Sequence, residues 1–191
     1  MIRKYICLLL HSITRLILRL RKKHKMEKYT LSIYLEKYLA QWFIFENDNT
    51  TPITLKKLSV ESRIIEVCST TTPVNVVEEE PADNLVEVKI VIPYFRYKDP
   101  QYYNYLPKAA RNQLKKSIRD RFIISLWTDL HRFGYIGKRH DMLVMAWMES
   151  HGINVDDTNF NTVLKIYQRQ YKNYLERRRR ERNSKEKLDK S

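Results

Sequence analysis

The stretch from Lys108 to Phe133 constrains the fold more than any other part of the chain, because its apolar residues recur every three or four positions. That spacing places them along one side of an α-helix, which must be buried against other elements. Pro107 suits the start of such a helix, and Gly134 suits the position after its end. The sequence therefore predicts one long helix with a buried stripe and a basic stripe. The first is Leu114, Ile118, Phe122, Leu126, Leu130 and Phe133, and the second is Lys108, Arg111, Lys115 and Arg119.

Two further helices are predicted behind this one. The first covers 139–151, and Gly152 followed by Ile153 predicts the left-handed turn that commonly ends a helix. The second begins near Asn159, where the preceding cap candidates are Asp156, Asp157 and Thr158. The expected buried side chains are Met142, Leu143, Ala146 and Trp147 in the first helix, and Phe160, Val163, Leu164, Tyr167, Tyr171 and Tyr174 in the second. Roughly the last ten residues of the chain lack an apolar period and are expected to fray.

The N-terminal half mixes a strand with short helices. Residues 29–35 are rich in β-branched and aromatic side chains and predict a strand. Residues 36–46 are compatible with a short helix or a continued strand, and the pattern favours the short helix. Residues 59–67 predict another short helix, with Val60, Ile64 and Ile65 facing inward and with Ser59 or Ser62 as its cap.

A β-hairpin is predicted further along this half. The strand-like runs 74–78 and 85–92 are joined by residues with turn chemistry. In the second run, apolar and polar residues alternate, so that one face packs and the other is partly wet. The expected packed face is Val86, Val88, Ile90 and Ile92.

Together these elements predict a mainly helical α+β fold, with short strands and a hairpin in the N-terminal half and a three-helix bundle at the C-terminal end. We expect one domain over 26–176, whose helical part begins at 107. A basic, apolar extension over 1–25 precedes this domain, and a basic tail over 177–191 follows it.

The segment 93–107 contains three prolines and six aromatic residues, and it predicts an irregular loop. Packing of the rings onto the domain is the more common arrangement for such a loop. The alternative is that the loop presents its rings beside Arg96 and Lys98, where bases of a nucleic acid could stack on them.

The net charge of +14 is distributed unevenly. Residues 1–25 hold eight Lys or Arg and no acid, residues 26–106 hold eight against twelve acids, and residues 107–191 hold twenty against ten. A basic excess confined to both ends of the chain indicates a polyanionic partner, either nucleic acid or an anionic membrane surface.

Residues 1–25 combine an apolar helical side with flanking basic residues. The longest uncharged run, 5–14, is about half the length that spans a bilayer. Such a helix could lie on a membrane surface. The composition changes at Met26, which resembles an ordinary protein start, so we expect this extension to be separate from the functional domain.

The chain lacks the sequence motifs of several classes of enzyme. The chain has only three glycines, too few and too scattered for a phosphate-binding loop. Its two cysteines, Cys7 and Cys68, form no C-x-x-C pair. A loose likeness to HD-domain phosphohydrolases, through His131, His140, Asp141, His151 and Asp156, has spacings too short for that family. No motif indicates a catalytic residue, metal or cofactor, so we expect a protein without enzymatic activity.

The strongest functional pattern is the pair of short helices after 138, which matches the plan of a DNA-binding helix-turn-helix module. The second helix would read bases with its first turn and contact phosphates along its length. Its connection to the first is longer than in the tight motif, and a plain three-helix bundle with a solvated basic face is the alternative. The predicted nucleic-acid-binding residues are Lys138, Arg139, Asn159, Asn161, Thr162, Lys165, Arg169, Lys172, Arg177, Arg178, Arg179 and Arg180.

The stretch 126–153, with 157–175 behind it, resembles small basic proteins encoded on bacterial phages and other mobile elements. The resemblance covers Met26 to about Arg180. It implies a cytoplasmic setting in a host cell and contact with nucleic acid, and that group has no assigned activity from which residue roles could be transferred.

The sequence thus favours an accessory protein of a phage or mobile element that binds nucleic acid, DNA rather than RNA. One alternative is a protein-interaction or virion structural component with a basic surface, assembled with a protein partner or as a homo-oligomer. Another is a membrane-surface protein that uses residues 1–25.

Overall fold

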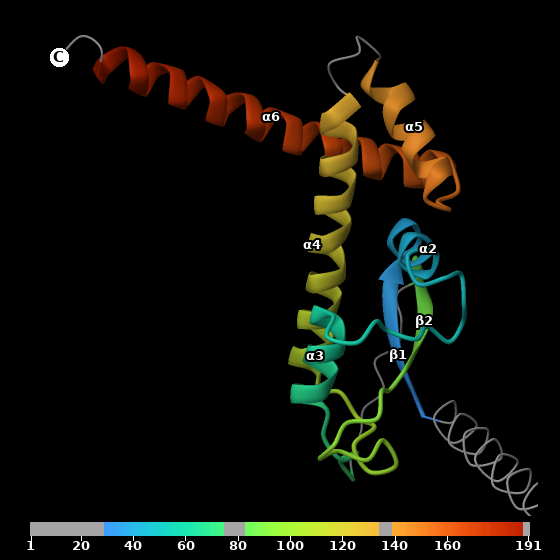
Figure 1. The fold of residues 1–191 in the computed structure, drawn as a ribbon. Coiled ribbons are helices and arrows are strands. Elements are labelled where there is room, and N and C mark those ends of the chain that lie inside the picture. The colour runs from blue at the N-terminus through green and yellow to red at the C-terminus, as the bar shows by residue number, and fades with distance from the viewer. Residues whose placement is uncertain (1–28, 75–82, 134–138, 189–191) are drawn as a thin grey trace, which may run out of the picture. The chain divides into compact units, whose positions relative to one another are not determined.

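The structure is a computed structural model that describes residues 29–74, 83–133 and 139–188 (Figure 1). The extension 1–25, the predicted strand 74–78 beyond its first residue, Gly134 and Lys138 lie outside the described residues. The elements are β1 (Thr30–Glu36), α2 (Lys37–Phe45), α3 (Val60–Cys68), β2 (Leu85–Val91), α4 (Lys108–Phe133), α5 (His140–Ser150) and α6 (Asp157–Leu188). The predicted α+β, mainly helical class is confirmed.

The chain groups into two compact units that interleave in sequence. Of the described residues, the first unit takes 29–35, 49–74 and 83–115, and the second takes 36–48, 116–133 and 139–188. Helix α4 therefore begins in the first unit and continues in the second. The units do not correspond to two consecutive halves of the chain.

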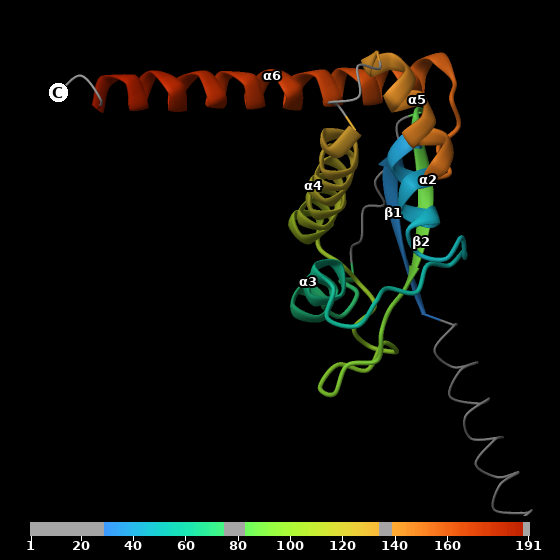
Figure 2. The ribbon, with the colours of Figure 1, turned by 45° about the horizontal axis from the view of Figure 1, so that its top comes forward.

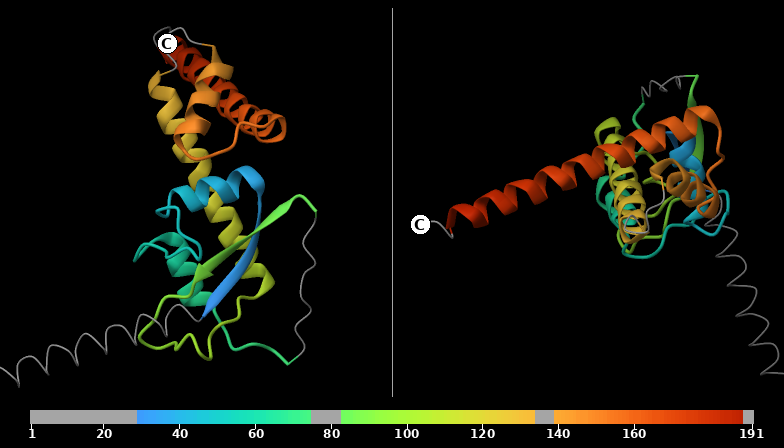
Figure 3. Two further views of the ribbon diagram at one scale, coloured as in Figure 1. Left: turned by 90° about the vertical axis from the view of Figure 1, so that its right-hand side faces the viewer. Right: turned by 90° about the horizontal axis from the view of Figure 1, so that it is seen from above.

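The sheet of the first unit pairs two strands that are far apart in sequence, β1 and β2 (Figure 3). They run antiparallel, because the backbone N–H of Ile92, just after β2, bonds to the carbonyl of Tyr29, just before β1, at 3.1 Å. Ile53 extends the pairing at β2 by donating to Lys89 and accepting from Val91, both at 2.8 Å. The buried side chains here include Leu31, Ile33, Leu35, Ile53, Val88, Ile90 and Ile92. The expected packed position Val86 is instead 38% exposed, since only the later part of β2 is covered.

The predicted helix at 59–67 is confirmed as α3, and of its two cap candidates, Ser59 and Ser62, the structure uses Ser59. The side chain of Ser59 accepts a hydrogen bond from the N–H of Ser62 at 3.1 Å, as an N-cap does. The inward face is shifted by one position, however, because Glu61, Ile64 and Ile65 are buried while Val60 is 64% exposed. Glu61 lies three and four residues before Ile64 and Ile65, so it shares a helix face with both, whereas Val60 is four residues from Ile64 alone.

The core of the second unit is built around Phe122, whose side chain is fully buried in α4. Its ring makes edge-on contacts with Tyr38 and Trp42 of α2 and with Trp147 of α5, at centroid separations of 5.1, 5.4 and 5.6 Å. Such T-shaped aromatic pairs add stabilisation beyond the area that they bury. The predicted stripe of α4 is confirmed at Leu114, Ile118, Phe122, Leu126 and Leu130.

Helix α5 ends as its glycine predicts. Gly152 has a φ of +68°, and the N–H of Ile153 bonds to the carbonyl of Met148 at 2.9 Å, which is the Schellman arrangement. The predicted inward face of α5 was partly wrong: Val144, Trp147 and Met148 are buried, while Met142 and Ala146 are exposed. The helix therefore turns a neighbouring stripe of its surface toward the core.

Helix α6 begins at a cap made by Asp156. Its Oδ1 accepts from the N–H of Asn159 at 2.9 Å, and its Oδ2 accepts from Lys37 Nζ of α2 at 2.8 Å. From there α6 continues past α4 and α5 (Figures 1 and 2) and stays helical to Leu188. Residues 182–188, which belong to the part of the tail expected to fray, are helical in the structure. Good helix formers such as Arg, Lys and Glu predominate there and no Gly or Pro occurs.

Candidate nucleic-acid interface

The predicted basic stripe of α6 lies on its surface. Lys165, Arg169 and Lys172 are all exposed, and they recur at three- and four-residue steps that place them along one side of the helix. Asn161 is exposed beside them. Thr162 is half-buried, and its hydroxyl donates to the carbonyl of Thr158 at 2.8 Å, which is a local helix bond.

Asn159 was predicted to contact bases, which requires an exposed side chain, but the structure buries it. It is 2% exposed, and its Nδ2 donates to the carbonyl of Asn154 and to Asp156 Oδ2, both at 3.0 Å. Gln41 Oε1 of α2 is a further acceptor at 3.3 Å. The amide is thus used to join the first turn of α6 to α2, and we leave Asn159 out of the interface.

The arginines that follow give α6 a second basic region. Arg177, Arg178, Arg179 and Arg180 are all exposed. Consecutive helical residues are about 100° apart, so four in a row present guanidinium groups around most of the helix. At the other predicted position, Arg139 precedes α5 and forms an ion pair with Asp141 at 2.8 Å.

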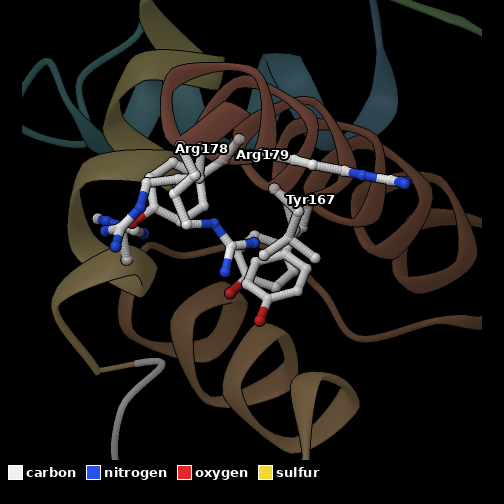
Figure 4. Close-up of a pocket in the computed structure, with 8 residues that line it drawn as sticks. Tyr167, Arg178 and Arg179 are labelled. Atoms are coloured by element: carbon white, nitrogen blue, oxygen red, sulfur yellow. The ribbon is translucent and has the colours of Figure 1, made fainter. Parts of the chain in front are cut away.

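A pocket of about 500 Å³ opens beside α6 (Figure 4). Its wall comes from the last part of α4 and from the middle of α6, and it combines aromatic rings with guanidinium groups. The lining residues are His131, Tyr167, Tyr171, Tyr174, Leu175, Arg178, Arg179 and Arg182.

The rings of the pocket are held by neighbouring rings. Trp127 stacks on His131 at a centroid separation of 4.6 Å and an interplanar angle of 23°, and His131 meets Tyr174 edge-on at 4.6 Å. From α5, His140 meets Tyr171 edge-on at 4.7 Å. Three helices therefore fix the orientation of the tyrosines, which lowers the entropy that a stacking partner would have to offset.

The basic part of the pocket is joined to the aromatic part. Arg178 lies over the ring of Tyr174, with its guanidinium carbon 5.8 Å from the centroid, and its Nη1 donates to the phenol oxygen at 3.0 Å. Arg182 lies one turn further along α6. Burial raises the pKa of the Tyr167 phenol, and the neighbouring Tyr171 raises it further. The chemistry offered is flat ring surface beside fixed positive charge.

This pocket was not predicted from the sequence, although the residue pattern that indicates it is present there. Tyr167, Tyr171 and Tyr174 were predicted only as a buried stripe. The same three- and four-residue spacing continues through Arg178 and Arg182, so that one helix face changes from tyrosine to arginine. His131 contributes from α4, a contact that no spacing within α6 could indicate.

The aromatic loop 93–107, which follows β2, packs some of its side chains and exposes others. Tyr94, Tyr97 and Tyr102 are 56%, 82% and 61% exposed. Lys98, which could have faced a phosphate, instead donates from Nζ to the carbonyls of Val67 and Ser69 at 2.8 and 2.9 Å. It thereby caps the C-terminal end of α3, where the helix dipole favours a cation.

Over residues 29–74, 83–133 and 139–188, no three His, Cys, Asp or Glu side chains come together as a metal site. No helix within these ranges has both the length and the apolar character needed to cross a bilayer. Comparisons with protein-family models, curated proteins and solved structures find no match for the chain.

Proposed function

We propose that the protein binds nucleic acid through α6, in an accessory role without catalysis. The observation that carries the proposal is the exposed basic surface that runs along this helix. It joins Lys165, Arg169 and Lys172 to the four arginines 177–180. The first group is the phosphate-contacting set predicted from the sequence, and its exposure supports that assignment.

The length of α6 suits a long polyanion better than a small anion. Its 32 residues correspond to about 48 Å of helix. A nucleic-acid backbone presents phosphates repeatedly over such a distance, and each one neutralised by Lys or Arg releases counterions. The interface should therefore bind several phosphates at once and weaken steeply as salt is added.

The interface lies further along α6 than a helix-turn-helix module would place it. The connection between α5 and α6 covers 151–156, and the first turn of α6 is occupied by its cap and by the bonds of Asn159. A helix-turn-helix reader presents that first turn to base edges. We therefore propose phosphate contact along the middle and C-terminal parts of α6, rather than base reading at its start.

The test is a binding titration of the full chain against labelled nucleic acid by fluorescence anisotropy. The variant R169E/K172E reverses two charges on α6, and K56E/K57E reverses two exposed charges in the first unit as a matched control. We expect at least about a tenfold weaker affinity for the first variant, because each contact to a phosphate is charge-assisted. Equal affinity for the two variants would contradict the assignment to α6.

A second candidate function is protein interaction through the aromatic loop, favoured by the exposure of Tyr94, Tyr97 and Tyr102. Exposed tyrosines are enriched at protein interfaces. Light scattering of the full chain, after nucleic acid has been removed, tests this function. A defined oligomer that the triple alanine variant of these tyrosines abolishes would support it, and a monomer at all concentrations would exclude self-assembly through the loop.

A further inference from the structure

We infer that the pocket beside α6 takes an unpaired base and its phosphate, so that the protein binds single-stranded nucleic acid in preference to duplex. This inference rests on the proposed function and goes further, since a basic helix alone would not discriminate between the two forms. Its basis is the combination, in one cavity, of aromatic rings held in place and arginines.

The size of the cavity fits this ligand. Pockets of about 300–1,000 Å³ are typical for small ligands, and the volume here is about 500 Å³. The half-buried rings of Tyr171, Tyr174 and His131 supply ring surface within it, while Tyr167 is fully buried beneath them. Arg178, Arg179 and Arg182 supply charge. A nucleobase provides the flat partner for the rings, and the phosphate attached to its sugar provides the anion for the guanidinium groups.

The rings are suited to stacking because they are already ordered. His131 is fixed between Trp127 and Tyr174, and Tyr171 is fixed by His140. Base stacking on such rings tolerates any base, because every base has a π-face. The pocket should therefore bind strands of varied sequence.

The charge is arranged next to the rings rather than among them. Arg178 is held by Tyr174 through its hydrogen bond and its position over the ring. Arg182 and Arg179 follow on α6, on the exposed stretch where the basic surface continues. A strand with one base in the pocket can therefore place its neighbouring phosphates along this helix.

The preference for single strands follows from how easily a base can enter the pocket. In a duplex, both faces of a base are covered by its neighbours and its edge is paired, so entry into a pocket requires unstacking that costs a few kcal/mol. An unpaired base in a flexible strand avoids most of this cost. The pocket thus adds affinity for single strands and little for duplex.

The experiment compares three labelled probes of equal length with the full chain: a single strand, its duplex, and an abasic strand that keeps the phosphates but lacks the bases. We expect the single strand to bind most tightly. The variants Y171L and Y174L should weaken that binding by roughly five- to a hundredfold, the worth of one stacked base. Y171L should leave abasic binding nearly unchanged, whereas Y174L should also weaken abasic binding slightly because it releases Arg178. Y102L, which removes an exposed tyrosine of the first unit, is the matched control and should change nothing.

Loss of folding is kept apart from loss of binding by a second pair of variants. R178Q and R182Q alter exposed residues of α6, and they should reduce the preference for the single strand while the thermal midpoint stays that of the wild type. An unchanged preference in the arginine variants, or in folded tyrosine variants, would overturn the pocket assignment.

The remaining outcomes separate this inference from the proposed function. Equal binding of all three probes would overturn the inference and leave the basic-helix function standing, whereas binding of none would overturn both. Displacement of the single strand by an equal concentration of a free nucleoside monophosphate would also overturn the strand assignment, because it would mark the pocket as a site for small nucleotides.

Discussion

Arg178 donates a hydrogen bond to the phenol oxygen of Tyr174 at 3.0 Å, and its guanidinium lies over the same ring. The two residues are one helical turn apart on α6, which is why they meet. This pair joins the ring-lined part of the pocket to its basic part. It fixes a cation that would otherwise sample many rotamers in solvent.

Substitution of Tyr174 by Phe isolates the hydrogen bond from the ring. The variant keeps the stacking surface and loses the phenol oxygen, so Arg178 should be less well ordered. We expect single-strand affinity to fall by only about three- to tenfold, since one net hydrogen bond is worth about 0.5–1.5 kcal/mol. Anisotropy titrations beside Y174L check this, and a loss in Y174F as large as in Y174L would mean that the ring contributes nothing.

Gly152 should be difficult to replace. Its φ of +68° is unfavourable for any residue with a Cβ, and a Cβ there would lie 2.7 Å from the ring of Phe45. We expect G152A to lower the free energy of unfolding by about 2 kcal/mol or more, from the left-handed conformation and the clash together. Urea denaturation measures this, with N154A in the same connection as a control that should be close to neutral. A wild-type midpoint for G152A would show that the connection adopts another conformation.

Phe122 should be the most sensitive position of the second unit. Its fully buried ring contacts Tyr38, Trp42 and Trp147 at once, so truncation leaves a cavity among aromatic rings. F122A is expected to cost about 3–5 kcal/mol, and F122L should cost distinctly less because it fills part of the space. Chemical denaturation of both variants provides the comparison. Equal costs for the two variants would argue against tight packing around this ring.

Acid should weaken the start of α6. The hydrogen bond from Lys37 lowers the pKa of Asp156, as do the backbone N–H of Asn159 and the positive charge of Lys37. A carboxylate whose pKa is lower in the folded state stabilises that state above its unfolded pKa of about 3.9, and this contribution is lost as pH falls through the lower folded pKa.

The thermal midpoint of the wild type should therefore fall below about pH 4 more steeply than that of D156N. Asn keeps the capping oxygen and cannot titrate, which makes it the matched variant. Parallel pH profiles for the two proteins would show that Asp156 does not contribute through its charge.

Local rules predicted much of the fold. The bounds of α4 and the turn at Gly152 follow from spacing and residue type, and the structure confirms them. Of the two cap candidates for α3, Ser59 and Ser62, the structure uses Ser59. The inward faces of α3 and α5 were each shifted, because Val60, Met142 and Ala146 are as compatible with burial as their neighbours. Which of two adjacent stripes is covered depends on the elements packed against them, and periodicity alone does not contain that information.

The part of the candidate site that lies within one helix could be predicted from spacing, and the part that depends on contacts between helices could not. The exposed stripe Lys165, Arg169 and Lys172 is a property of one helix, so spacing within that helix could find it. Asn159 was assigned to the surface because its packing partner, Gln41, lies in α2. His131 and His140 meet the α6 tyrosines only through folding, and the pocket therefore became visible only in the structure.

The salt dependence of single-strand binding by the full chain tests the central claim, that α6 binds phosphates, most directly. For a protein that neutralises phosphates, the logarithm of affinity falls linearly with the logarithm of salt, and each lost contact reduces the slope by roughly one. We predict a slope for R169Q/K172Q that is smaller than wild type by about two, with K56Q/K57Q unchanged. Identical slopes for all three proteins would contradict the account, because Arg169 and Lys172, the phosphate-contacting residues of the predicted stripe, would then contact no phosphate.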